Sequence, residues 1–315
     1  MSRGTALVTG ASGFVGSRLA GELAREGWSV RCMVRDPSSA AAERLEQRGF
    51  DVRQGDALRP STLRGVARGV DVAYYLIHSM GRGAGGDFSA RERAAATAFA
   101  QTARAEGVQR AVYLGGLGAQ DASRHLRSRH ASALALIEHG PPLTYLRAAM
   151  VVGAQSASYR TLRHLVQRLP AMIAPAWLQN ATQPIAVDDA LRYLALAPAQ
   201  APPGTAEVQI GGPEVLTYGE MLDRMAIALG LRPRPRLPVP LITPWLSSLW
   251  IGLVTPVDAH VARALIEGLS APTVVTDPRG AEAFAVTPVG FDEALRRALA
   301  EEDPQGRAQA PAQAA

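Results

Sequence analysis

The stretch Ala6-Leu-Val-Thr-Gly10-Ala-Ser-Gly13-Phe-Val-Gly16-Ser-Arg-Leu-Ala20 decides the fold of this 315-residue chain. An apolar run ending at Thr9 predicts a strand, and an amphipathic pattern from Phe14 predicts a helix. The recurring glycines suit a tight turn whose backbone approaches a pyrophosphate, because glycine has no Cβ. The helix N-terminus presents free N–H groups and a positive dipole end to that anion. The stretch therefore predicts dinucleotide binding, with a purely structural turn as the alternative.

Strand-like and helix-like segments alternate through the first half of the chain. The apolar runs lie at Ala6–Thr9, Ser29–Val34, Phe50–Arg53, Val70–Ile77, Arg110–Leu114 and Leu143–Leu146. Helical patterns lie between them at Phe14–Glu26, Ala40–Arg48, Ser61–Arg68, Ser89–Glu106 and His125–Glu138. Such alternation predicts right-handed βαβ units and an α/β fold with a Rossmann-type, doubly wound parallel sheet.

The second half is less regular and contains a helical pattern at Tyr159–Arg168 and a strand at Glu207–Ile210. A further helix is expected to begin at Asp188 or Asp189 as its N-cap. Another is expected after Thr217, because Glu220 follows at the spacing of a capping box.

Arg35 follows the second predicted strand and bears on the choice of cofactor. A carboxylate at this place suits the ribose hydroxyls of NAD, whereas an arginine suits the 2′-phosphate of NADP. Asp36 comes next, and its carboxylate weakens the preference for NADP that Arg35 indicates. Arg18, on the first predicted helix, is a candidate second ligand of the 2′-phosphate. NADP is therefore expected and NAD remains possible; an ordinary solvated arginine is the alternative reading of Arg35.

The composition excludes some kinds of chemistry. All 33 of the Lys+Arg residues are arginines, so no lysine can act as a nucleophile or Schiff base. Residues 1–150 hold 20 Arg against 13 Asp and Glu, but we find no nucleic-acid recognition module and expect no nucleic-acid partner. The histidines show no metal-ligand spacing, and no metal is expected. A single cysteine, Cys32, and a start that lacks a signal-peptide pattern favour the cytoplasm.

The segment Leu237–Val257 carries no charge and is long enough to cross a bilayer. Its four prolines argue against one continuous helix. We expect it to be buried against the protein, and a peripheral membrane or subunit contact is the alternative.

The chain resembles the atypical or extended short-chain dehydrogenase/reductase superfamily, in particular its NmrA-like and complex-I-accessory-subunit-like NAD(P)H-binding proteins. The resemblance covers nearly residues 5–300. The stretches that carry it are Val8-Thr-Gly-Ala-Ser-Gly-Phe-Val-Gly16, Arg35-Asp-Pro37, Gly55-Asp56, Asp71-Val-Ala-Tyr-Tyr-Leu-Ile-His78-Ser79-Met80, Leu114-Gly-Gly-Leu-Gly-Ala119, Leu146-Arg-Ala-Ala-Met-Val-Val-Gly153, Pro184-Ile-Ala-Val-Asp-Asp189 and Gly211-Gly-Pro-Glu-Val-Leu-Thr217.

This resemblance implies a Rossmann core over residues 1–152, completed by 181–212, and a smaller, mostly helical substrate lobe over 153–180 and 213–300. Residues 301–315 are expected to form a disordered tail. The resemblance also implies that Asp56 lies near the adenine and that the strand ends 76–80 and 114–116 line the cofactor cleft. The expected cofactor-binding set is Gly10, Ser12, Gly13, Phe14, Val15, Gly16, Arg35, Asp56, Ala57, Leu76, Gly115 and Arg129.

The chain departs from the superfamily at the catalytic positions. Catalytic members use Ser or Thr after the fifth strand and Tyr-x-x-x-Lys on the next helix, with the tyrosine as general acid. Here Gly115 and Gly116 end the strand, and His125-Leu-Arg-Ser-Arg129 stands where Tyr-x-x-x-Lys is expected. We interpret His125, Arg129 and His78 as candidate catalytic residues, His125 as a proton donor with an ordinary pKa near 6.5.

Two functions remain open on the sequence alone. The first is an NADP(H)-dependent oxidoreductase that acts on a small apolar molecule such as a quinone, an aldehyde or a lipid. Its substrate is expected between residues 151–159, the 170–180 loop and the apolar segment 237–257. The second is a non-catalytic NAD(P)H-binding redox sensor or assembly subunit, which the missing Ser/Tyr/Lys set favours. The oligomeric state is not predicted.

Overall fold

A computed structural model describes residues 3–77, 88–119, 123–169, 172–174, 176–238 and 271–303 of the chain. Its centre is a seven-stranded sheet in the order β11-β6-β5-β4-β1-β2-β3, in which every pairing is parallel. These strands are β1 (Thr5–Thr9), β2 (Ser29–Val34), β3 (Asp51–Gln54), β4 (Val72–Tyr75), β5 (Arg110–Gly116), β6 (Leu143–Ala148) and β11 (Ala206–Ile210). The predicted Rossmann-type α/β fold is confirmed.

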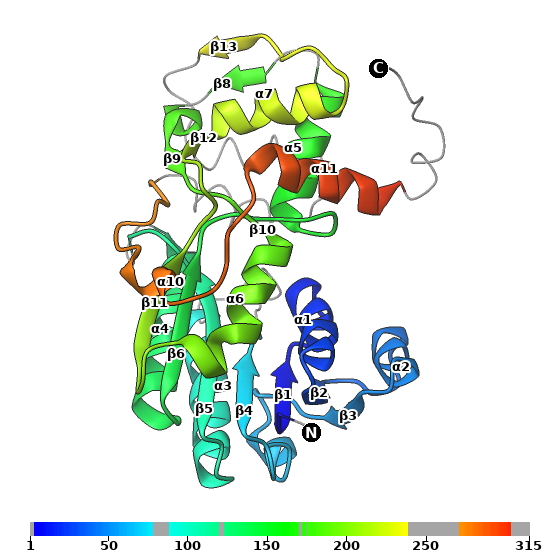
Figure 1. Cartoon of the computed structure of the whole chain (residues 1–315), viewed down its shortest axis with the longest axis vertical. Coiled ribbons are helices and arrows are strands. Elements are labelled where there is room, and N and C mark those ends of the chain that lie inside the picture. Colours follow the sequence, from blue (N-terminus) through cyan, green and yellow to red (C-terminus); the bar gives the residue numbers. More distant parts are fainter. Residues whose placement is uncertain are drawn as a thin grey trace.

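Strand order reverses between β1 and β4, which are neighbours although two strands separate them in the sequence. At such a switch point the connections leave in opposite directions, so a crevice opens outside the carboxyl ends of the strands. Those ends point towards the second lobe at the top of Figure 1. The glycine turn after β1 therefore lies at the end of the sheet that faces the second lobe.

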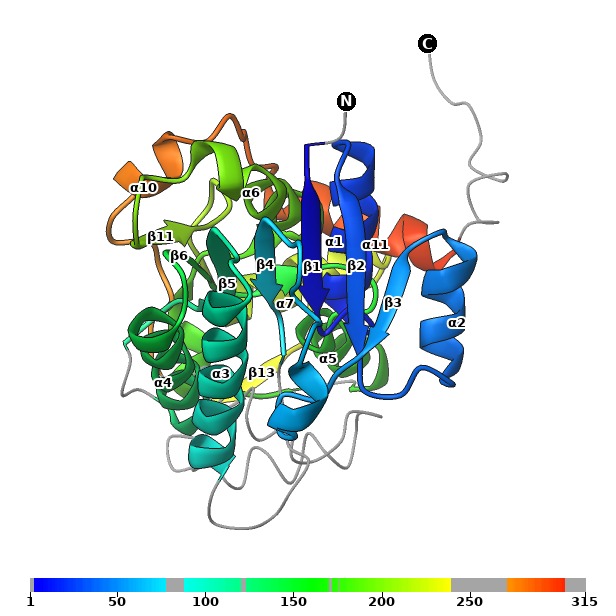
Figure 2. The same cartoon turned by 90° about the horizontal axis from the view of Figure 1, so that it is seen from below.

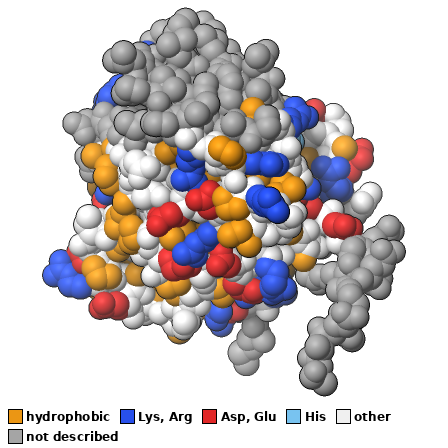
Figure 3. Space-filling view, turned by 90° about the horizontal axis from the view of Figure 1, so that it is seen from above, with side chains coloured by type: hydrophobic (Ala, Val, Ile, Leu, Met, Phe, Trp, Pro, Cys, Tyr) orange, Lys and Arg blue, Asp and Glu red, His pale blue; other side chains and the backbone are white. Residues whose placement is uncertain are grey.

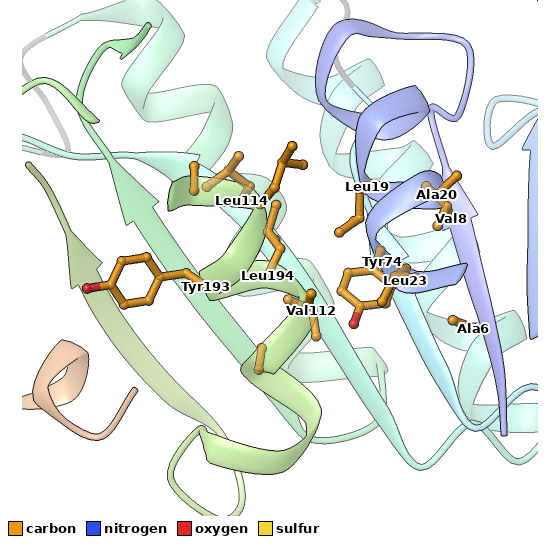
Figure 4. Packing of buried hydrophobic residues seen from close by; sticks show 14 of the residues in the cluster. Ala6, Val8, Leu19, Ala20, Leu23, Tyr74, Val112, Leu114, Tyr193 and Leu194 are labelled. Atoms are coloured by element: carbon orange, nitrogen blue, oxygen red, sulfur yellow. The ribbon is translucent and has the colours of Figure 1, made fainter. Parts of the chain in front are cut away.

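Helices cover both faces of the sheet (Figure 2). One face carries α1 (Phe14–Arg25), α2 (Ala40–Gln47) and α6 (Val187–Gln200), and the other carries α3 (Phe88–Ala105) and α4 (Arg124–His139). In Figure 4, Leu19 and Leu23 of α1 and Leu194 of α6 surround Tyr74 and Val112 of the sheet. All five side chains are fully buried, so this layer fixes α1 and the turn before it.

The second lobe is built around α5 (Ala157–Arg168), α7 (Tyr218–Ala228) and α11 (Phe291–Glu302), whose apolar faces share one core. The remaining elements are short: η1 (Pro60–Leu63), β7 (Val151–Val152), β8 (Met172–Ala174), η2 (Ala176–Gln179), β9 (Ala181–Thr182), β10 (Ile185–Ala186), β12 (Leu216–Thr217), β13 (Arg236–Pro238) and α10 (Arg279–Glu282). Thr217 and Glu220 form the predicted capping box at the start of α7. The described part of this lobe is mostly helical, as expected.

Three sequence expectations about the elements are wrong. The predicted helix Ser61–Arg68 is only the 3₁₀ turn η1, because Arg64 is extended and Gly65 adopts a φ of +80°. Asp188 and Asp189 lie in the first turn of α6, and its N-cap is Ala186. Helix α11 continues to Glu302, so the proposed tail cannot begin at residue 301.

The place of β11 bears on the domain boundaries. This strand comes from the second half of the sequence and pairs with β6, whose Leu146 faces Val208 in register. The sheet is thus completed by residues within 181–212, although the division into a core and a substrate lobe stays a prediction. Of the apolar stretch 237–257, only Leu237 and Pro238 are described, as the end of β13, so its predicted burial lies outside the described residues.

None of the described helices combines the length and the low polarity needed to cross a membrane.

Candidate cofactor-binding and active site

The glycine turn after β1 has the geometry of an anion cradle. Gly10 adopts a φ of +63°, and the Gly13 N–H donates to its carbonyl at 2.9 Å, which closes the turn. A Cβ on Gly10 would lie 2.5 Å from the Leu76 carbonyl oxygen at the end of β4. Any side chain here is therefore strained and also collides with the backbone.

Gly16 and Gly13 serve different purposes in the cradle. A Cβ on Gly16 would collide with the Gly10 carbonyl, so this glycine permits α1 to pack against the turn. A Cβ on Gly13 would meet only the Gly10 oxygen, at 3.1 Å, so the outer side of the turn is open. Gly13 is the N-cap of α1 and offers no side-chain cap to the helix. The first N–H groups of α1, from Phe14, Val15 and Gly16, are therefore available to an anion, and the residues fit a dinucleotide pyrophosphate.

Thr9, which sequence reasoning did not single out, fastens the turn to the neighbouring strand. Its hydroxyl donates to the Tyr74 carbonyl at 3.0 Å and accepts the Leu76 N–H at 3.0 Å. The side chain is fully buried. Thr9 thus joins the ends of β1 and β4 at the switch point; a polar residue ending an apolar run was the available signal.

Arg35 is exposed directly after β2, where the adenosine ribose of a Rossmann cofactor lies. The neighbouring Asp36 carboxylate is engaged inside its own loop. It accepts the Ser38 N–H at 2.9 Å and the Ser38 hydroxyl at 2.6 Å, and these hydrogen bonds lower the pKa of the carboxyl. Asp36 is therefore less suited than Arg35 to contact the ribose.

The end of β3 places Asp56 and Ala57 at the same edge of the sheet. The Asp56 carboxylate accepts the Leu58 N–H at 3.0 Å, and its own N–H donates to the Thr62 hydroxyl at 2.8 Å. Ala57 is buried. These hydrogen bonds fix the conformation of the turn that carries Asp56 and Ala57, the residues predicted to lie near the adenine.

Arg18 does not accompany Arg35. Its guanidinium forms an ion pair with Glu301 of α11 and lies 4.5 Å from the ring centroid of Phe14. The suggestion that Arg18 joins Arg35 around a 2′-phosphate is not supported, because Glu301 already neutralises it. Arg18 instead links the start of α1 to the second lobe.

His125 and Arg129 lie together at the carboxyl edge of the sheet, as their i,i+4 spacing predicts. Arg129 Nε donates to His125 Nε2 at 2.9 Å, and its Nη1 reaches the Leu114 carbonyl at 3.5 Å. Burial, and then the charge of Arg129, lower the pKa of His125 to about 3. The expected pKa near 6.5 is therefore wrong: the imidazole is neutral near pH 7, with its proton on Nδ1.

The two glycines at the end of β5 are closely covered. A Cβ on Gly116 would lie 2.5 Å from Leu126 Cδ2 and 3.6 Å from Arg129 Cδ. A Cβ on Gly115 would lie 2.7 Å from the Tyr145 hydroxyl oxygen. The positions where the superfamily carries a hydroxyl side chain are here filled by neighbouring side chains.

Arg147, a further residue that sequence reasoning missed, holds the segment that follows β5. Its Nε donates to the Gly116 carbonyl at 3.0 Å, its Nη2 donates to the Gly118 carbonyl, and its Nη1 pairs with Glu207 of β11 at 2.7 Å. The residue is only 8% exposed. A buried arginine that binds two carbonyls fixes the backbone of the cleft wall. A charged residue inside an apolar strand was the signal in the sequence.

The predicted substrate region is only partly described. Val152 and Tyr159 lie in the core of the second lobe and are both almost fully buried. A cavity of about 70 Å³ lies nearby between β7, the start of α6 and α11.

The candidate His78 and the loop that follows it lie outside the described residues. Among the residues that the structure describes, no group of three His, Cys, Asp or Glu side chains could hold a metal ion.

Comparison with known proteins agrees with this geometry. Residues 10–164 match the model of a family described as NAD(P)H-binding. The chain is 28% identical over 243 residues to a protein named ceramide reductase from Caulobacter vibrioides (strain NA1000 / CB15N), covering 76% of this chain and 75% of that protein.

Two solved structures with the same fold have cofactors bound. Triphenylmethane reductase from Citrobacter sp., in complex with NADP(H), gives a TM-score of 0.73 at 16% identity over 94% of this chain and 99% of that chain. The enzyme WbmH of Bordetella bronchiseptica, in complex with NAD+, gives a TM-score of 0.69 at 17% identity, over 96% of this chain and 99% of that chain. The predicted resemblance is thus confirmed for a Rossmann fold with an NAD(P)H-binding domain.

Proposed function

We propose that this chain, whose residues 10–164 match an NAD(P)H-binding family, is an NADP(H)-dependent oxidoreductase with a small, apolar, lipid-like carbonyl or quinone substrate. The observation that carries the proposal is the open glycine cradle at the switch point of the sheet, with Arg35 exposed at its adenosine end. The bound cofactor supplies a hydride, and the chain positions it.

Each part of the chain has a distinct task in this reaction. The start of α1 holds the pyrophosphate through its N–H groups, and Arg35 binds the 2′-phosphate that distinguishes NADP from NAD. The Arg129 guanidinium, which offers only donors, helps to position the nicotinamide ribose. The neutral His125 orients Arg129 through the hydrogen bond between Nε2 and Nε.

A lipid-like substrate is supported by the relative named ceramide reductase and by the uncharged stretch 237–257 in the second half of the chain. In general, proteins hold long-chain substrates in pockets lined mainly by apolar side chains, with few polar contacts. We therefore propose a long-chain ketone, aldehyde or quinone as the substrate class, and peripheral contact with a membrane as the way such a substrate is reached.

The test is NADPH oxidation by the purified full chain, followed by absorbance, with a long-chain ketone, a long-chain aldehyde and a quinone. The short-chain homologues of each substrate serve as controls. We expect turnover only with the long-chain compounds. Equal rates with short and long chains would contradict the apolar substrate class.

A non-catalytic NAD(P)H-binding sensor is the second candidate. It is favoured by Gly115 and Gly116 at the end of β5 and by the neutral His125. Tight binding of NADPH without oxidation by any of these substrates would support the sensor and overturn the enzyme.

A further inference from the structure

A tyrosine of β6 brings a hydroxyl group to the end of β5. Tyr145 stands in a row of three rings on one face of the sheet, with Tyr113 and Tyr75 in register on β5 and β4. Its ring is stacked on Tyr113 with 5.3 Å between centroids. The ring leans towards the carboxyl ends, because a Cβ on Gly115, two residues beyond Tyr113, would lie 2.7 Å from its hydroxyl oxygen. Glycine at position 115 is therefore what leaves room for this hydroxyl.

Other buried hydroxyl groups near this edge are already engaged or enclosed. Thr9 donates to the Tyr74 carbonyl at 3.0 Å, and Tyr113 donates to the Arg129 carbonyl at 3.2 Å. The Tyr74 hydroxyl has no partner, but its ring is fully enclosed in the core beside α1 (Figure 4).

Tyr145 differs from all of them. It is 3% exposed, and its hydroxyl makes no hydrogen bond to any residue that the structure describes. Unlike the Tyr74 hydroxyl, the Tyr145 hydroxyl is not a fully buried atom without a partner, so its oxygen keeps some exposure through which a ligand can reach it.

The charges of two arginines act on Tyr145. The Arg147 guanidinium carbon is 6.0 Å from the ring centroid, and Arg129 approaches from α4. Burial raises the pKa of Tyr145. The charge of Arg147 opposes that rise, the Glu207 carboxylate that pairs with Arg147 adds to it, and the charge of Arg129 opposes it. The hydroxyl is therefore protonated near neutral pH. The two arginines stabilise the phenolate once the proton has left, and Glu207 offsets part of the Arg147 charge.

We propose that Tyr145 is the proton donor of this site and donates to the substrate carbonyl oxygen beside Gly115. The proposal rests on the oxidoreductase function proposed above. The hydride forms a C–H bond at the carbonyl carbon, and the C=O π electrons move to the oxygen. That oxygen takes the Tyr145 proton, and the resulting phenolate regains a proton from water. No oxidant or reductant other than the nicotinamide cofactor is required.

The first experiment compares Tyr145→Phe with Tyr113→Phe. Both changes remove one hydroxyl from neighbouring stacked rings, so the second is a matched control for packing. We expect Tyr145→Phe to lower kcat by ~10²-fold or more, the usual contribution of a positioned acid, with NADPH affinity within about threefold of the parent. Tyr113→Phe is expected to keep most of the activity.

The second experiment needs no substrate. Phenolate formation is titrated by ultraviolet absorbance in the free protein and in its complexes with NADP+ and NADPH. A positive nicotinamide ring near Tyr145 favours its phenolate, so NADP+ is expected to lower the pKa of one tyrosine more than NADPH does. This difference is expected to vanish in Tyr145→Phe and to persist in Tyr113→Phe.

Each outcome has a defined meaning. The proposal is overturned if Tyr145→Phe retains kcat, if Tyr113→Phe loses as much, or if the titration does not respond to NADP+. If the parent oxidises no substrate but the titration responds, the proposed function fails while the placement of Tyr145 beside the nicotinamide stands.

Discussion

At the scale of single residues, the local environment of His125 changes its chemistry. From the sequence alone, this histidine suggests an acid with a pKa near 6.5. Arg129 removes that possibility by donating to Nε2 at 2.9 Å and by placing a positive charge beside the ring. The contact between His125 and Arg129 was predictable from their i,i+4 spacing. The lowered pKa of His125 was not, because it depends on burial at the sheet edge, which is a tertiary property.

The pH dependence of stability tests this environment. In the unfolded chain His125 takes up a proton near pH 6.5, whereas in the folded protein its pKa is about 3. The unfolded state therefore binds more protons between these values, and stability falls as the pH falls. We expect His125 to account for about 2 kcal/mol of the loss between pH 7 and pH 5. Urea denaturation at both pH values should show a smaller loss for His125→Gln; an equal loss would contradict the lowered pKa.

Arg35 gives a second prediction at this scale. Replacing it with Asp removes the cation proposed to bind the 2′-phosphate and adds a charge that repels it, so NADPH affinity should fall by ~10-fold or more relative to NADH. Dissociation constants for both cofactors, measured by fluorescence, check this. Asp36→Asn is the matched control, because Ser38 already holds that carboxylate, and it should change the preference little. An unaltered preference in Arg35→Asp would remove the argument for NADP.

At the scale of elements, helix α11 joins the two lobes by its last turn. Glu301 pairs with Arg18 of α1, and Glu302 pairs with Arg163 of α5 and accepts a hydrogen bond from Tyr159. Arg18 is one helical turn after Phe14, which lies at the anion cradle. The end of α11 thus supports the helix whose N-terminus forms the anion cradle.

We expect Glu301→Gln combined with Glu302→Gln to lower the free energy of unfolding by ~1 kcal/mol, since partly exposed ion pairs contribute little individually. Added salt should reduce the difference between the parent and the double variant. Glu293→Gln is the control, because Glu293 pairs only with Arg296 and Arg297 of its own helix in the described structure. A larger loss in the control than in the double variant would argue against the link between the lobes.

Elements differed in how well their sequences predicted them. The strands of the sheet were evident because buried parallel strands are apolar on both faces, as in Val72–Tyr75. The segment Ser61–Arg68 looked helical, yet Gly65 adopts a positive φ and the helix ends after one turn, at Leu63. The Tyr145 hydroxyl could not be placed, because its position depends on how β6 aligns with β5.

At the scale of the whole molecule, the excess of arginine is dispersed. The face in Figure 3 shows acidic and basic side chains side by side over its described part. Buried Arg147 donates to the Gly116 carbonyl, and Arg31 binds Asp51 and two backbone carbonyls. Several arginines of the basic first half are therefore structural. The net charge of +5 therefore carries no information about the cofactor.

Cofactor binding should stabilise the whole protein. A ligand that binds only the folded state at 100 times its dissociation constant adds about 2.7 kcal/mol. For a chain of this size we expect Tm to rise by ~5 °C or more with NADPH. Thermal denaturation with NADPH and with NADH at equal concentration measures this effect and its preference. No rise with either nucleotide would contradict binding at the glycine cradle.

The place of β11 has a consequence for how the protein is made. The NAD(P)H-binding match ends at residue 164, yet the edge of β6 and the charge of Arg147 find their partners only in residues 206–210. During translation, the ribosome must add more than forty residues after the matched segment before the sheet can close. Until then an apolar parallel strand presents an open edge, which is prone to aggregation. The length of chain that must be synthesised before the sheet can close is therefore greater than the segment that matches the NAD(P)H-binding family.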